Sequence, residues 1–113
     1  MKWMRITEVA NIPVRQGRSV RFGALEVAIF NLGGAFRAVE SRCPHKRGPL
    51  ADGIVAGDDI ICPLHNWRIS LDSGFVKQPK DHSESCVKTY PCRVEGGVIE
   101  VAVPDEAVKG EAA

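Results

Sequence analysis

Two short segments of the sequence each place a cysteine beside a histidine. The first is Cys43-Pro44-His45, and sixteen residues separate it from the second, Cys62-Pro63-Leu64-His65. Each pair is compact enough to bind a metal from a single loop, and together the pairs offer two thiolates and two imidazoles. Two kinds of centre accept this set. One is a tetrahedral zinc ion, and the other is a [2Fe–2S] cluster with two Cys on one iron and two His on the other.

The order of the ligands favours the cluster over zinc. Each loop would give one Cys to one iron and one His to the other, so the diiron unit would be clamped between two loop tips. Zinc sites more often group like ligands, as Cys-x-x-Cys followed by a His pair. Zinc remains the alternative. Four unrelated loop side chains are the least favoured interpretation, because matched pairs with a proline beside each cysteine rarely arise by chance.

The rest of the sequence predicts a β scaffold that would position these two loops. Short apolar runs alternate with turn signals such as Gly33-Gly34 and Gly96-Gly97. No long amphipathic helical period is present. The pattern predicts an all-β fold, an antiparallel sandwich or barrel. The predicted strands are Trp3–Val9, Ser19–Phe22, Leu25–Leu32, Ala35–Glu40, Ile54–Ile61 (broken at 57–59), Trp67–Leu71, Phe75–Lys77, Cys86–Tyr90, Cys92–Glu95 and Val98–Val103.

The length of 113 residues is typical of one domain. We expect that domain to span residues 1–103, with a cluster-binding subdomain at about residues 41–80 and a flexible C-terminal tail over residues 104–113. A domain this small buries a modest fraction of its surface, so a bound cofactor would add usefully to its stability.

Charge and hydropathy exclude several classes of function. The formal net charge of +1 argues against nucleic acid as the main partner. No apolar run is long enough to span a bilayer, and the N-terminus lacks an apolar stretch of signal-peptide length, which predicts a cytoplasmic protein without a membrane partner. In the reducing cytoplasm, cysteines are more often metal ligands or buried thiols than partners in disulfides. Cys86 and Cys92 lack a nearby loop histidine, so we expect them to be buried thiols, and we expect His82 to be exposed.

The two Cys/His segments resemble the two motifs of the Rieske family. The wider pattern includes Cys43-Pro44-His45-Lys46-Arg47-Gly48, His65-Asn66-Trp67-Arg68-Ile69, Leu71-Asp72-Ser73-Gly74 and Thr89-Tyr90-Pro91. With these segments, most of the chain resembles the small subunit of the assimilatory NAD(P)H-dependent nitrite reductase.

This resemblance implies a fold, a ligand set and a partner. The fold would be a Rieske-type antiparallel β base carrying a small two-loop cluster-binding subdomain. Cys43, His45, Cys62 and His65 would hold the [2Fe–2S] cluster. The partner would be a large subunit with FAD, a [4Fe–4S] cluster and sirohaem, and the assembly would reduce nitrite to ammonium in nitrate assimilation. The chain itself would transfer electrons, bind no small-molecule substrate and not catalyse the reaction alone.

The resemblance also predicts a reduction potential. High-potential Rieske proteins of respiratory complexes have an additional cysteine in each motif, joined as a disulfide, and a hydroxyl donor after the second motif. The corresponding residues here are Gly48, Leu64 and Trp67. We therefore expect a potential at the low end of the Rieske range, which runs from roughly −150 to +300 mV.

Two other functions remain open from the sequence. A stand-alone Rieske ferredoxin of a ring-hydroxylating dioxygenase would share both motifs, but such ferredoxins commonly have Gly after the second His, where this chain has Asn66, and they tend to be acidic. A structural docking subunit is the other alternative. Lys46, Arg47 and Arg68 flank the ligands and either dock an acidic partner or are solvated loop charges. Trp67 would either shield the cluster or belong to the core, and Gln78-Pro79-Lys80 would form a third loop over the cluster.

Overall fold

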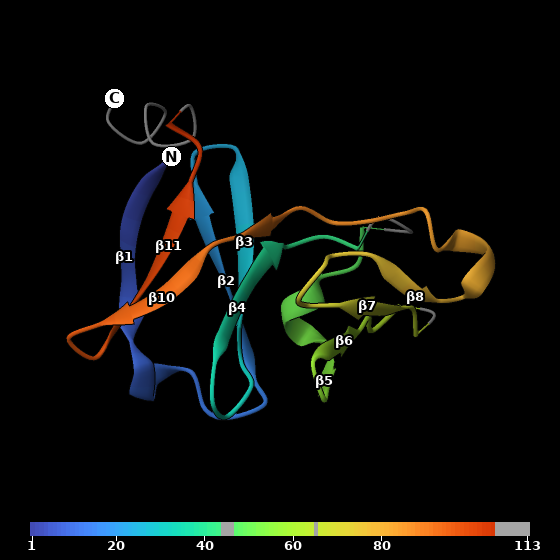
Figure 1. Ribbon diagram of the computed structural model, residues 1–113, viewed down its shortest axis with the longest axis horizontal. Helices are drawn as coiled ribbons and strands as arrows, with labels where there is room; N and C mark the ends of the chain where they lie inside the picture. Colours follow the sequence, from blue (N-terminus) through green and yellow to red (C-terminus); the bar gives the residue numbers. More distant parts are fainter. Residues whose placement is uncertain (44–46, 65, 106–113) are drawn as a thin grey trace.

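The described part of the chain folds into three antiparallel sheets (Figure 1). The computed structural model describes residues 1–43, 47–64 and 66–105. One sheet has the order β1 (Lys2–Glu8), β11 (Val98–Val103), β10 (Cys92–Glu95). The central sheet has the order β2 (Gly17–Phe22), β3 (Leu25–Asn31), β4 (Phe36–Glu40), β9 (Thr89–Tyr90). The third sheet has the order β5 (Ile54–Ala56), β6 (Asp59–Ile61), β7 (Arg68–Ser70), β8 (Val76–Gln78). Short 3-10 turns are η1 (Val9–Asn11), η2 (Leu50–Asp52) and η3 (Lys80–His82).

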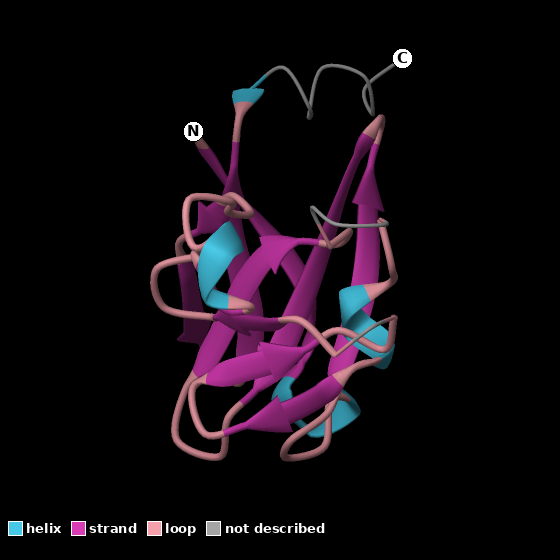
Figure 2. Ribbon diagram, turned by 90° about the vertical axis from the view of Figure 1, so that its right-hand side faces the viewer, coloured by secondary structure: helices cyan, strands magenta, loops and turns pink. Residues whose placement is uncertain are grey.

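The central sheet is covered on both faces. In β3, Val27 and Ile29 belong to an apolar cluster shared with β11, whereas Ala28 and Phe30 belong to a second cluster shared with the third sheet. All four side chains are fully buried. A strand buried on both faces reads as a continuous apolar run rather than an alternating one, which explains the sequence Val-Ala-Ile-Phe at this place. The central sheet is therefore packed between the sheet that contains β11 and the third sheet, and the third sheet faces the viewer in Figure 2.

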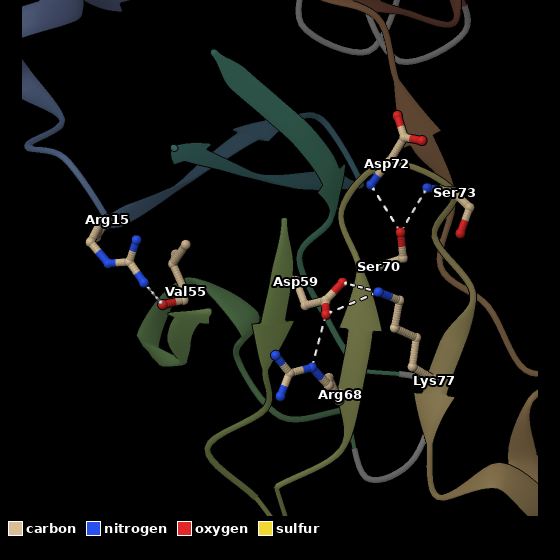
Figure 3. A network of polar contacts seen from close by, with 8 residues as sticks. All are labelled: Arg15, Val55, Asp59, Arg68, Ser70, Asp72, Ser73 and Lys77. Atoms are coloured by element: carbon tan, nitrogen blue, oxygen red, sulfur yellow. Dashed lines mark hydrogen bonds and ion pairs between the residues drawn. The ribbon is translucent and has the colours of Figure 1, made fainter. Parts of the chain in front are cut away.

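A polar contact also joins the loop before β2 to the third sheet. Arg15 lies in the loop before β2 and has a left-handed backbone with φ of 67°. Its Nη2 donates a hydrogen bond of 3.0 Å to the carbonyl oxygen of Val55 on the edge strand β5 (Figure 3). Beside this contact, the side chains of Val14 and Ile54 are exposed.

The predicted all-β antiparallel fold is confirmed, and its strands lie close to the predicted places. The prediction for Cys86–Tyr90 was wrong in extent, since only Thr89 and Tyr90 form a strand. The physical reason is that the start of this segment lies beside residues 74–76, with an isolated bridge between Phe75 and Cys86. The segment reaches the edge of β4 only at its end, where Thr89 pairs with Val39 and Tyr90 with Ala38. The predicted tail over residues 104–113 lies mostly outside the described residues.

Gly53 offers a test of how closely the strands before the second Cys/His loop are packed. A Cβ added there would overlap the backbone oxygen of Ile61, directly before Cys62. Gly53→Ala should therefore lower the free energy of unfolding by about 1–3 kcal/mol, because the backbone must shift to relieve the overlap. Gly34→Ala is the matched control, since an added Cβ meets nothing within 4 Å there. Thermal denaturation that found both variants equally stable would contradict this packing.

Candidate metal centre

The two predicted loops are built in the same way. In the first, the N–H of Cys43 donates to the carbonyl of Gly48 at 2.9 Å; in the second, the N–H of Cys62 donates to the carbonyl of Trp67 at 2.8 Å. Each hydrogen bond closes a loop of six residues that begins with the cysteine. The fifth residue of each loop is left-handed, with φ of 56° at Arg47 and 59° at Asn66. Asparagine tolerates this conformation better than most residues. The described residues of the two loops therefore share a closing hydrogen bond and a left-handed fifth residue.

Both cysteines of these loops are buried. Cys43 is 1% exposed and Cys62 is 0% exposed, and both belong to the apolar cluster that packs on the central sheet. The first loop contacts the second, because a Cβ added at Gly48 would lie 2.9 Å from the Sγ of Cys62 and 3.0 Å from the Cγ of Leu64. Close approach of the two loops requires a residue without a side chain at position 48.

These observations fit a cluster held between the loops. Thiolate is a soft ligand suited to iron–sulfur clusters, and both sulfur-bearing side chains are shielded from water by apolar neighbours. His45 and His65, the other two predicted ligands, lie outside the described residues. The side chains that are described contain no group of three or more His, Cys, Asp or Glu that could hold a metal ion.

A buried carboxylate stabilises the hairpin that carries the second loop (Figure 3). Asp59 on β6 is 5% exposed and accepts a 2.8 Å hydrogen bond from Nε of Arg68 on β7. The Nζ of Lys77 on β8 lies 3.0 Å from its Oδ1. Arg68 is opposite Gln78 and Ile69 opposite Val76, so Lys77 is the extra residue of a β-bulge. The network therefore joins three neighbouring strands, and Arg68 directly follows the residue that closes the second loop.

The charge state of Asp59 follows from its neighbours. Burial alone would raise the pKa of this carboxyl, but hydrogen bonds and charge attraction from Arg68 and Lys77 outweigh burial and hold the pKa below its ordinary value of 3.8. A lowered pKa means that the network stabilises the fold above about that pH and that the stabilisation is lost as the pH falls through the lowered value. The sequence pattern does not single out Asp59, because Gly57-Asp58-Asp59 is typical of a turn. Its two cationic partners, Arg68 and Lys77, follow only later in the chain.

The indole of Trp67 belongs to the core beside the second loop. It is 8% exposed and stacks on the imidazole of His82 with ring centroids 4.8 Å apart and an interplanar angle of 30°. His82 ends η3, which follows Pro79, and its side chain is 51% exposed, as expected. The stack brings η3 against Trp67, the last residue of the second loop. A third loop over the cluster at Gln78-Pro79-Lys80 stays a prediction.

The expectation that Cys86 is buried was wrong. Its side chain is exposed, whereas its neighbour Val87 is 4% exposed. Successive side chains of an extended chain point to opposite sides, and Val87 takes the inward place. Cys92 is half-buried, and burial raises the pKa of its thiol to about 11.

The basic residue Arg68, which the sequence left as either a docking charge or a solvated one, forms an ion pair with Asp59. Lys46 lies outside the described residues.

Asp59→Asn tests the role of the buried network. The amide removes the negative charge between two cations, which should lower the free energy of unfolding by about 1–3 kcal/mol and accelerate loss of bound iron, because the second loop loses its support. Glu100→Gln is the matched control. Glu100 is 7% exposed and is paired with Arg5 and Arg93, but it lies on β11 in the opposite sheet. Denaturation and iron-release rates should show similar destabilisation of both variants but rapid iron loss only from Asp59→Asn; equal iron loss would contradict the assignment.

The described residues contain no helix of the length and apolarity needed to cross a lipid bilayer.

Comparison with known proteins places the chain in a family. Residues 2–91 match the Rieske [2Fe-2S] domain. The chain is 33% identical over 97 residues to the biphenyl dioxygenase ferredoxin subunit of Pseudomonas sp. (strain KKS102), covering 85% of this chain and 87% of that protein. It is 29% identical to the 4beta-methylsterol monooxygenase of Methylococcus capsulatus, of which it spans only 31%.

A solved structure is similar over nearly its whole length. It is a proposed NADH-dependent nitrite reductase small subunit from Mycobacterium tuberculosis, with a TM-score of 0.82, 25% identity, and coverage of 91% of this chain and 96% of that one. The all-β fold, the twin loops with their buried cysteines and the match over residues 2–91 lead to one conclusion: the chain belongs to the Rieske [2Fe–2S] domain family and is an electron-transfer domain of an oxidoreductase system.

Proposed function

We propose that Cys43, His45, Cys62 and His65 hold the [2Fe–2S] cluster. When bound, the cluster takes up and releases one electron at a time. The burial of Cys43 and Cys62, the hydrogen bond that closes each loop and the close approach of Gly48 to Cys62 support this ligand set. Two thiolates, rather than four, leave the centre less negative, so it accepts an electron more readily than an all-cysteine cluster.

The surroundings of the loops favour a potential at the low end of the Rieske range. Gly48 and Leu64 stand where high-potential members have their disulfide, and these two positions are in contact here. No cross-link joins them, and Trp67 replaces the hydroxyl donor.

The cluster assignment predicts a definite metal content and spectrum. Protein purified without oxygen should contain two irons per chain and, after dithionite reduction, give the rhombic EPR signal of a His-ligated diiron centre with a midpoint below about 0 mV. Cys62→Ser should abolish the signal because it removes a thiolate ligand. Cys86→Ser, which changes an exposed thiol, should leave it intact. One zinc per chain, after attempted iron–sulfide reconstitution, would sink the electron-transfer assignment.

We further propose that the chain is the cytoplasmic electron-transfer small subunit of an NAD(P)H-dependent nitrite reductase. Its large partner would carry FAD, a [4Fe–4S] cluster and sirohaem and would reduce nitrite to ammonium. The observation that carries this proposal is the near full-length similarity to the Mycobacterium tuberculosis protein, since the match covers almost all of both chains. The residue after the second histidine, Asn66 rather than Gly, and the near-neutral charge also favour it over a dioxygenase ferredoxin.

A stand-alone Rieske ferredoxin is the second candidate. The similarity to the biphenyl dioxygenase ferredoxin subunit favours it, because the identity is 33% and the two proteins have nearly the same length. Both candidates use the same cluster and differ in the protein that receives the electron.

Electron transfer to each candidate acceptor separates the two functions. The dithionite-reduced chain, freed of excess reductant, should be oxidised rapidly by nitrite together with the large nitrite reductase subunit. It should react slowly with nitrite alone, because the chain binds no substrate. Oxidation by a ring-hydroxylating oxygenase and not by the large subunit would establish the ferredoxin function instead. If Cys43→Ser supported complex assembly and full nitrite reduction, the chain would be a structural docking subunit.

A further inference from the structure

A polar pocket opens beside the first cluster loop. Its volume is about 490 Å³, and the charged and hydroxyl side chains that line it are Arg21, Glu26, Glu40, Ser41, Arg42 and Arg47. They come from β2, β3, the end of β4 and the loop itself. No part of the cluster assignment uses this pocket.

The pocket contains an excess positive charge. Glu26 is shared by two arginines, with 3.8 Å to Nη2 of Arg21 and 3.1 Å to Nε of Arg42. Glu40 accepts the backbone N–H of Lys88 at 2.6 Å. Arg47 has no ion-pair partner among the described residues. Three guanidinium groups therefore face two carboxylates, which leaves one cation uncompensated.

The donors of the pocket remain available to a ligand. The side chain of Arg21 is 62% exposed and that of Arg42 is 39% exposed. Each guanidinium has five N–H groups in a planar fork that matches a carboxylate in a two-bond arrangement. Glu26 takes up only part of this capacity, so the outer N–H groups can bind a second carboxylate.

The pocket borders the first of the two loops that we propose to hold the cluster. Arg42 directly precedes Cys43, and Arg47 is the fifth residue of the same loop, so a group bound here touches both ends of the first cluster loop. The backbone of Arg47 is fixed by its N–H donation to the carbonyl of Cys43 at 2.9 Å. A charge-paired contact at this place would steer the partner toward the cluster.

We propose that this arginine pocket receives a carboxylate side chain of an acidic segment on the large subunit, and so docks the electron-transfer partner against the first loop. This inference rests on the proposed nitrite reductase function. A single exposed ion pair is weak, so the pocket acts as the orienting part of a larger interface and contributes mostly to the rate and the salt dependence of association.

Charge reversal at Arg21 tests the proposal. Isothermal titration of the cluster-loaded chain with the large subunit should show about five- to tenfold weaker binding for Arg21→Glu at low salt, and a smaller difference at high salt, where exposed charges are screened. Arg21→Gln, which avoids placing a second carboxylate opposite Glu26, should weaken binding in the same direction by a smaller factor. Lys2→Glu is the matched control, because it makes the same change of net charge at an exposed position on β1.

Each outcome has one meaning. Weaker binding of both Arg21 variants, with native cluster absorbance and with Lys2→Glu binding like the unmodified chain, would support the docking pocket. Equal binding of the Arg21 variants and Lys2→Glu would overturn the pocket and leave the proposed function standing. Failure of the unmodified chain to bind the large subunit would overturn the proposed function and, with it, this partner.

Discussion

The double-sided burial of β3 is the constraint on which the arrangement of the whole molecule depends. Alternate side chains of Val27 to Phe30 enter two different apolar clusters. One is shared with β11, and the other contains Cys43 and Cys62. Interiors of this kind are close-packed and resist small displacements. The cysteines therefore share one packed interior with the strand that also anchors the base. The first residue of each of the two loops, Cys43 and Cys62, is therefore held in a close-packed interior.

The strands and loops whose structure depends on neighbouring residues in the chain could be predicted from the sequence. Apolar alternation and paired glycines located the strands, and the Cys/His spacing located both loops. What escaped prediction depends on distant partners. Asp59 reads as a turn residue until Arg68 and Lys77, from two other strands, are placed beside it. The exposure of Cys86 follows from the inward place of Val87, and the short β9 follows from where the chain meets β4. The arginine pocket gathers residues from two stretches of the chain, 21–26 and 40–47.

The relatives of the chain show how little of its role resides in the fold. A dioxygenase ferredoxin subunit and a proposed nitrite reductase small subunit match most of the same residues. The same fold therefore serves proteins of different function. The partner of the chain therefore does not follow from the fold alone.

The hydrogen bond from Arg15 to Val55 has a consequence for colloidal behaviour. β5 is an edge strand with an exposed Ile54 and an exposed Val14 beside it, a combination that favours strand-to-strand association between molecules. The guanidinium already occupies the central carbonyl of that three-residue edge and sets a positive charge over it. An incoming strand from another copy would have to displace the arginine and desolvate its charge. One side chain thus both links the loop before β2 to the third sheet and obstructs strand pairing at this edge.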